Sequence, residues 1–91
     1  MAVMFTRLQV DDYEAWKPMF DADPAEARHE AKSHRILRTV DDPNSLLVQV
    51  EFDSVDAARA ARERLVSSGV LDRQRSHDGP TIAEVADTVT Y

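Results

Sequence analysis

The same local pattern occurs twice in this sequence: an apolar, strand-like run leads directly into the acidic start of a helix. The first copy spans Val3 to Val10 and continues into Asp11 to Trp16. The second spans Leu46 to Phe52 and continues into Asp53 to Ala58. Acidic or hydroxyl side chains just before an apolar-periodic segment are typical of helix N-caps. Two such strand-to-helix units predict an α+β fold with the order βαββαβ, in which helices cover one face of a four-stranded antiparallel sheet.

The other elements come from turn residues and alternating side chains. His34 to Val40 is predicted as a strand, and Asp41 to Ser45 as the turn that joins it to the strand Leu46 to Phe52 in a hairpin. On that third strand, Val48, Val50 and Phe52 share one face and are expected in the core. Gly69 is predicted to end the second helix. His77 to Pro80 is predicted as a loop, and Thr81 to Tyr91 as the last strand.

The first helix carries an apolar stripe at helical spacing, formed by Tyr13, Trp16 and Phe20, which is expected to face the sheet. Asp23-Pro24-Ala25-Glu26 has the order of a second N-cap, with Pro at the first helical position and Glu three residues after the cap. We therefore expect this helix to be bent or split near Asp23.

Length and composition narrow the class of protein. The 91 residues are predicted to form one domain, 1–91, and the net charge of −6 argues against nucleic-acid binding, which needs clustered Lys and Arg. No apolar run approaches the roughly 20 residues of a membrane helix, so no membrane partner is expected. The chain has no Cys, which agrees with a reducing compartment, and a cytoplasmic location is the default expectation.

Both faces of the predicted sheet carry apolar side chains, although the helices cover only one of them. On the first strand, Val3 and Phe5 lie on the face opposite to Met4 and Leu8. On the third strand, Leu47 lies on the face opposite to Val48 and Val50. An antiparallel sheet with one wet face usually has a polar outer register. The sequence therefore predicts a homodimer in which two sheets pack face to face about a two-fold axis. In this dimer the end of the last strand is able to extend the edge of the partner's sheet. The alternative is a monomer with some exposed apolar residues.

Several short motifs resemble small bacterial proteins of the dimeric α/β-barrel superfamily. They are Phe5-Thr6-Arg7, Val10 to Lys17, Phe20-Asp21, Ser33-His34-Arg35 with Asp41-Asp42-Pro43, Val50 to Asp53, and Gly79-Pro80. The superfamily includes cofactor-independent antibiotic-biosynthesis monooxygenases, polyketide cyclases, haem-degrading enzymes and muconolactone isomerases. The resemblance implies a ferredoxin-like protomer in a sheet-on-sheet dimer. Some of these enzymes rely on an Asn of the first strand, whereas the only Asn here, Asn44, lies in a predicted turn.

Two residues are candidates for catalysis. His34 begins the second predicted strand near a sheet end, and an imidazole can transfer protons near neutral pH; the alternative is a partly exposed strand-end histidine. Arg7 lies in the more polar register of the first strand, where it can polarise or hold a substrate oxygen. Glu51 lies in the same register of the third strand and is a candidate for orienting the substrate. The alternative for Arg7 and Glu51 is an ion pair across the dimer interior.

Tyr13, Trp16 and Phe20 are candidates for the wall of an aromatic-ligand pocket, and the alternative is that they are core anchors. His29 and His34 lack the spacing and the third ligand of a metal site, and no glycine-rich phosphate loop is present. We therefore expect neither a metal nor a cofactor.

Two functional hypotheses follow from these residues. The first is a cofactor-independent monooxygenase or cyclase that acts on a hydrophobic aromatic or polyketide-like molecule. The second is a non-catalytic dimeric module that binds a metabolite or assists a partner protein, because the sequence contains no dense catalytic constellation.

Overall fold

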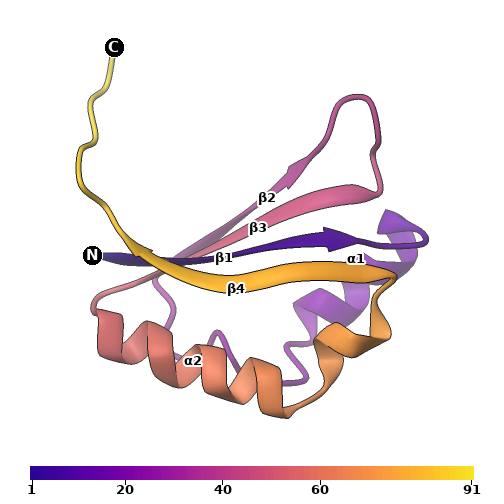
Figure 1. Cartoon of the computed structure of the whole chain (residues 1–91), viewed down its shortest axis with the longest axis horizontal. Coiled ribbons are helices and arrows are strands. Elements are labelled where there is room, and N and C mark those ends of the chain that lie inside the picture. The colour runs from indigo at the N-terminus through magenta and orange to yellow at the C-terminus, as the bar shows by residue number, and fades with distance from the viewer.

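A computed structural model describes all residues 1–91 and has the predicted order of elements (Figure 1). In chain order they are β1 (Ala2–Gln9), α1 (Tyr13–Asp21), β2 (Ser33–Arg38), β3 (Ser45–Phe52), α2 (Val55–Ser67), a short 3-10 helix η1 (Val70–Arg73) and β4 (Ser76–Glu84). The strands form one antiparallel sheet in the order β2-β3-β1-β4. Both helices lie on the same side of this sheet. The predicted α+β fold with ferredoxin-like βαββαβ topology is therefore confirmed.

The core lies between the sheet and the helices. Met4 of β1 pairs with Val50 of β3, and Leu8 pairs with Leu46, so alternate residues of both strands face the helices together. Phe52 is completely buried, and the predicted burial of the third strand's apolar register is confirmed. Because side chains alternate across a strand, the intervening residues lie on the face that no helix covers.

The two helices approach the sheet to different extents. Ser54 caps α2 by accepting a bond from the Ala57 amide at 3.1 Å, and the buried Ala58 and Ala61 let the helix lie close to the strands. Asp12 caps α1, but no Cα atom of α1 comes within 8 Å of a Cα atom in another helix or strand. Helix α1 therefore reaches the sheet through large side chains alone, which leaves room for a cavity.

The segment after α1 differs from the prediction. Helix α1 ends at Asp21, and residues 22–32 form turns with no second helix. Asp23 does accept bonds from backbone amides, those of Ala27 at 3.1 Å and Arg28 at 3.2 Å, but its φ of 49° and that of Glu26 at 53° are left-handed. Asp23, the predicted cap, therefore closes a turn and does not begin a helix. We call residues 22–32 the 22–32 segment.

The last strand begins and ends earlier than predicted. Residues His77 to Pro80, predicted as a loop, lie within β4, which pairs with β1 through a register shift between Phe5 and Arg7. A bulge accommodates turn-like residues within a paired strand. Residues 85–91 lie beyond the strand and are exposed, and Figure 1 shows them leaving the sheet on the side opposite the helices.

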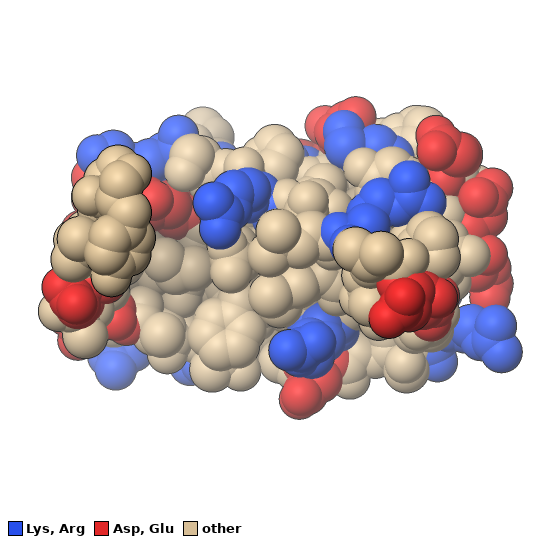
Figure 2. All heavy atoms as spheres, turned by 90° about the horizontal axis from the view of Figure 1, so that it is seen from above, with Lys and Arg blue, Asp and Glu red and all other residues tan.

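The uncovered face of the sheet is mixed in character. Val3, Phe5 and Leu47 are only partly buried there, and Leu37 is exposed. Seen from this side, neutral side chains fill much of the middle of the face, with Lys and Arg between them (Figure 2). We call this surface the open face. No helix in the structure has the length and apolar character that crossing a bilayer requires.

Candidate functional site

A cavity of about 80 Å³ lies beneath α1 and the 22–32 segment, against the helix-facing side of the sheet. Strands β1 and β3 form its floor through Met4, Thr6, Leu8, Val48 and Val50. Its other walls come from α1, the 22–32 segment and the end of α2 with η1. Of its 17 lining residues, 12 are hydrophobic. An apolar hollow with a few polar groups is the usual form of a small-molecule site.

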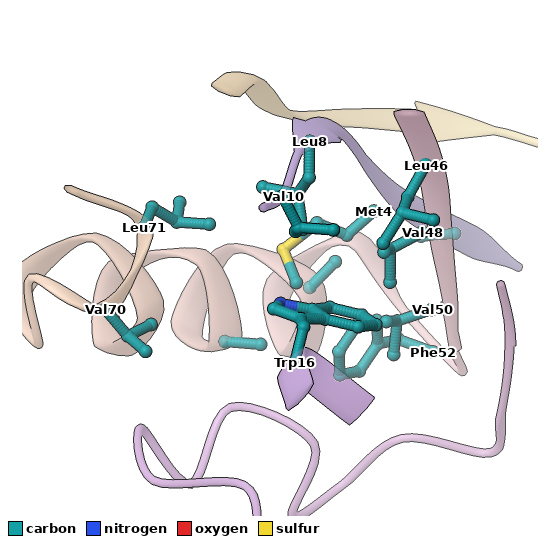
Figure 3. Close-up of a cluster of buried hydrophobic side chains, with 13 residues drawn as sticks. Met4, Leu8, Val10, Trp16, Leu46, Val48, Val50, Phe52, Val70 and Leu71 are labelled. Carbon is teal, nitrogen blue, oxygen red and sulfur yellow. The ribbon is translucent and has the colours of Figure 1, made fainter. Parts of the chain in front are cut away.

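Trp16 links α1 to the floor of this cavity. Its side chain reaches from α1 in among Met4, Val48 and Val50 (Figure 3), and it is 6% exposed. The Phe20 ring follows one turn later, with its centroid 4.9 Å from that of Trp16, and it also lines the cavity. Two adjacent aromatic rings offer a flat, polarisable wall to an aromatic ligand.

Two polar groups at the cavity have no partner within the chain. Thr6 is the only buried polar residue, at 5% exposure, and neither its hydroxyl nor the indole N–H of Trp16 takes part in a hydrogen bond. Every fully buried polar side-chain atom of the protein does have a partner, so these two groups retain some accessible surface. Both residues line the cavity. A hydroxyl and an N–H that stay accessible at a cavity can bind the oxygen atoms of a ligand.

Asp23 and Arg28 are the charged residues of the cavity wall. Nε of Arg28 lies 3.6 Å from Oδ1 of Asp23. The guanidinium lies 3.8 Å above the Phe20 ring centroid, and its Nη2 donates to the Phe20 carbonyl. These contacts hold the 22–32 segment against the end of α1.

The expected aromatic residues have different positions around this site. Trp16 and Phe20 line the cavity, whereas Tyr13 lies beside it, with its ring 5.9 Å from Trp16 and beneath the guanidinium of Arg38 at 4.1 Å. His34 is exposed on β2 and meets the Phe20 ring edge-on at 5.2 Å between centroids. The structure therefore brings the aromatic stripe and His34 to the same region.

Arg7 and Glu51 lie on the open face, away from the cavity. Arg7 is exposed and pairs in register with Leu47, while Glu51 pairs with Val3. No ion pair joins the two charges within the chain. A second hollow, of about 360 Å³, is lined by residues of β1, β2 and β3 and brings Glu51 and His34 together with polar neighbours.

Sequence reasoning missed Thr6 and Arg28 as site residues. Thr6 shares its register on β1 with the apolar Met4 and Leu8, and a polar residue in that register was the signal that could have found it. Arg28 gave no signal, because its place depends on the unexpected turn after α1. No group of three or more His, Asp or Glu side chains is arranged to hold a metal ion.

Fold and cavity together define a class: a ferredoxin-like α+β protein with an apolar hollow between its sheet and its first helix. Solved structures of antibiotic biosynthesis monooxygenase-like proteins have this fold, and the fold that the sequence motifs implied is confirmed. Scans against protein-family models and curated protein sequences find no match.

Among the similar structures is SnoaB, a cofactor-independent oxygenase from Streptomyces nogalater solved as a point mutant. It has a TM-score of 0.72 at 20% identity, covering 99% of this chain and 97% of that one. An antibiotic biosynthesis monooxygenase-like protein from Nitrosomonas europaea has a TM-score of 0.69 at 21% identity, covering 96% and 100%. A third, from Deinococcus radiodurans, has a TM-score of 0.63 at 13% identity, covering 100% and 98%. These likenesses span the whole chain and define its fold.

Proposed function

We propose that the protein binds a hydrophobic aromatic or polyketide-like molecule in the cavity beneath α1 and acts on it as a cofactor-independent monooxygenase or cyclase. The observation that carries this proposal is the cavity itself, with its apolar walls and with the Thr6 hydroxyl and the Trp16 N–H, which have no partner within the chain. The likeness to SnoaB, a cofactor-independent oxygenase, supports the choice of reaction. The proposed setting is the cytoplasm.

Ligand entry requires the cavity to widen. Its volume of about 80 Å³ is below the ~150 Å³ of an engineered cavity that admits benzene. Helix α1 is the element most able to move, because beyond the amide of Tyr13, which donates to Asn44, only its side chains reach the sheet. The 22–32 segment follows it in the chain and contributes Asp23, Pro24, Ala25, Ala27 and Arg28 to the wall. We propose that both shift outward when a ligand enters.

In this proposal Trp16 and Phe20 hold the flat face of the substrate, and Tyr13 supports Trp16 from behind. Thr6 donates its hydroxyl to a substrate oxygen. His34, at the edge of Phe20, moves a proton at the margin of the site. Such a reaction suits a substrate that forms a stabilised carbanion, because that carbanion can react with oxygen without a cofactor.

The proposed assembly is a homodimer with its open faces together. Val3, Phe5 and Leu47 give this face its partly buried apolar side chains. Residues 85–91 leave the sheet toward that side, and a partner sheet edge is a suitable place for them. Within the dimer we propose that Arg7 and Glu51 pair across the interface or orient the substrate from there.

A direct test uses anthrone as the probe, because loss of a proton from its methylene group gives a stabilised carbanion. Oxidation of that group to a carbonyl consumes one O₂ per anthrone and releases one water, giving anthraquinone. The purified protein is expected to accelerate both oxygen uptake and quinone formation. Ala25→Phe should block the reaction, because Ala25 lines the cavity. Ala22→Phe is the matched control, because Ala22 is exposed at the end of α1. Equal rates in the two variants would place the reaction elsewhere.

One observation favours a second candidate, a non-catalytic metabolite-binding module. The cavity wall contains no His, Lys, Glu or Tyr, and the Asp23 carboxylate already accepts two backbone bonds. This candidate predicts saturable binding of aromatic probes that Ala25→Phe abolishes, with no product formed from any of them. Reproducible turnover by the pure protein excludes it.

A further inference from the structure

Arg28 is a mostly buried charge on the cavity wall. It belongs to the 22–32 segment, its side chain is 16% exposed, and it is the only positively charged residue that lines the cavity. The guanidinium stacks on the Phe20 ring at 3.8 Å. This stacking fixes the plane of the guanidinium beside the aromatic wall.

The guanidinium has more donors than partners. An arginine side chain carries five N–H donors, and the guanidinium of Arg28 makes one hydrogen bond, from Nη2 to the Phe20 carbonyl. Its contact with Asp23 is an ion pair at 3.6 Å, beyond hydrogen-bond distance. The Asp23 carboxylate is held by the backbone amides of Ala27 and Arg28, so it does not depend on the guanidinium. Several donors of this mostly buried cation thus have no partner within the chain. Every fully buried polar side-chain atom does have one, so these donors retain some accessible surface at the cavity wall.

We propose that Arg28 recognises an anionic group of the ligand, so that the cavity prefers aromatic carboxylates to neutral aromatics of the same shape. This inference rests on the proposed function, because it assumes that the cavity binds a small molecule. A carboxylate accepts two parallel bonds from a guanidinium, and charge-assisted bonds of this kind are about twice as strong as neutral ones. The aromatic part of the ligand lies against Trp16 and Phe20 while its carboxylate reaches the unused donors. Asp23 keeps its backbone bonds when this happens.

The test compares naphthalene-2-carboxylate with naphthalene-2-carboxamide, which has nearly the same shape and no charge. Trp16 is the only Trp, so its indole N–H gives one resonance in a ¹⁵N-labelled sample of the full chain, and each probe is titrated against that resonance. The carboxylate is expected to bind at least about tenfold more tightly, in line with the strength of charge-assisted bonds. Equal affinities for the two probes overturn the role of Arg28 and leave the proposed function standing. If neither probe moves the resonance, both proposals fail.

Variants then assign the preference to one residue. Arg28→Met is expected to bind the carboxylate and the carboxamide equally, and Arg28→Gln, which keeps hydrogen-bond donors without the charge, should do the same. Arg38→Met is the matched control, since Arg38 stacks on Tyr13 at 4.1 Å but does not line the cavity. It should keep the wild-type ratio. A carboxylate preference that survives in both Arg28 variants, or that disappears in Arg38→Met, contradicts the assignment.

Discussion

Leu46 and Leu47 are neighbours on β3 with the same side chain, and they separate the two faces of the sheet. Leu46 is 1% exposed and faces the helices, while Leu47 is partly buried on the open face. Truncation to alanine removes three carbons in either case. For Leu46→Ala the transfer and cavity terms together predict a loss of about 3–5 kcal/mol in the free energy of unfolding. In a domain of this size that lowers the Tm by at least ~12 °C.

Leu47→Ala is expected to act on association instead. If the open face is exposed in a monomer, Leu47→Ala lowers the free energy of unfolding of that monomer by about 1 kcal/mol or less, since part of the Leu47 side chain is already in contact with water. If the open faces pair, the rest of its apolar area becomes buried in the dimer. A two-fold axis places the change at the interface twice. About 1 kcal/mol per copy then weakens dimerisation by about 2 kcal/mol, or roughly 30-fold in Kd.

Sedimentation velocity over a range of protein concentrations measures the dimer Kd, and thermal unfolding followed by circular dichroism measures stability. The reasoning predicts that Leu46→Ala changes mainly the Tm and Leu47→Ala mainly the Kd. An unchanged Kd in Leu47→Ala would refute the pairing of the open faces. A Tm loss of equal size in both variants would refute the assignment of the core face.

Three further changes test the local structure. Thr6→Val replaces a hydroxyl that has no partner in the chain, so the Tm should stay within a few degrees while anthrone turnover or probe affinity falls about tenfold; a large Tm loss would show that the hydroxyl stabilises the fold. Asn44→Ala removes the acceptor of the Tyr13 amide, at 3.0 Å, and should cost about 1–2 kcal/mol in denaturant unfolding because it frees the first turn of α1; no change would mean that this clamp is dispensable. Gly79→Ala should cost about 1–3 kcal/mol or more, because the φ of Gly79 is 102° and a Cβ there would lie 2.9 Å from the Phe5 carbonyl oxygen; wild-type stability in the same unfolding experiment would contradict the close approach of β4 to β1.

The sequence was informative where local pattern and long-range packing agree. The alternation of β3 placed Val48 and Val50 in the core, and Gly69 ended α2 in a left-handed conformation, with φ 74°. Both features depend on the period of a strand or the freedom of a glycine. Such features are set by a few neighbouring residues, and neighbours are visible in a sequence.

The sequence was misleading where one local motif is compatible with two different structures. Asp23 with Glu26 has the order of a capping box, yet Asp23 closes a turn instead, and Arg28 reaches the cavity only because of that turn. Asp78 and Gly79 are turn-forming residues, but they lie within β4, whose pairing with β1 keeps this segment in a strand. In both cases contacts with distant residues decide between local alternatives, and one sequence does not reveal those contacts.

The same limit applies to the site residues. Helical spacing was sufficient to place Trp16 and Phe20 on one wall. The separation of Arg7 from the cavity follows from the sheet register, which assigns it to the open face. The roles of Arg7, Glu51 and His34 stay predictions.

The central claim is that the cavity beneath α1 holds a small aromatic molecule, and native mass spectrometry tests it most directly. The protein is purified gently from its own host and measured before and after incubation with anthrone. The account predicts the mass of two chains carrying a bound small molecule, and loss of that added mass in Ala25→Phe but not in Ala22→Phe. A bare chain mass that anthrone leaves unchanged would contradict it.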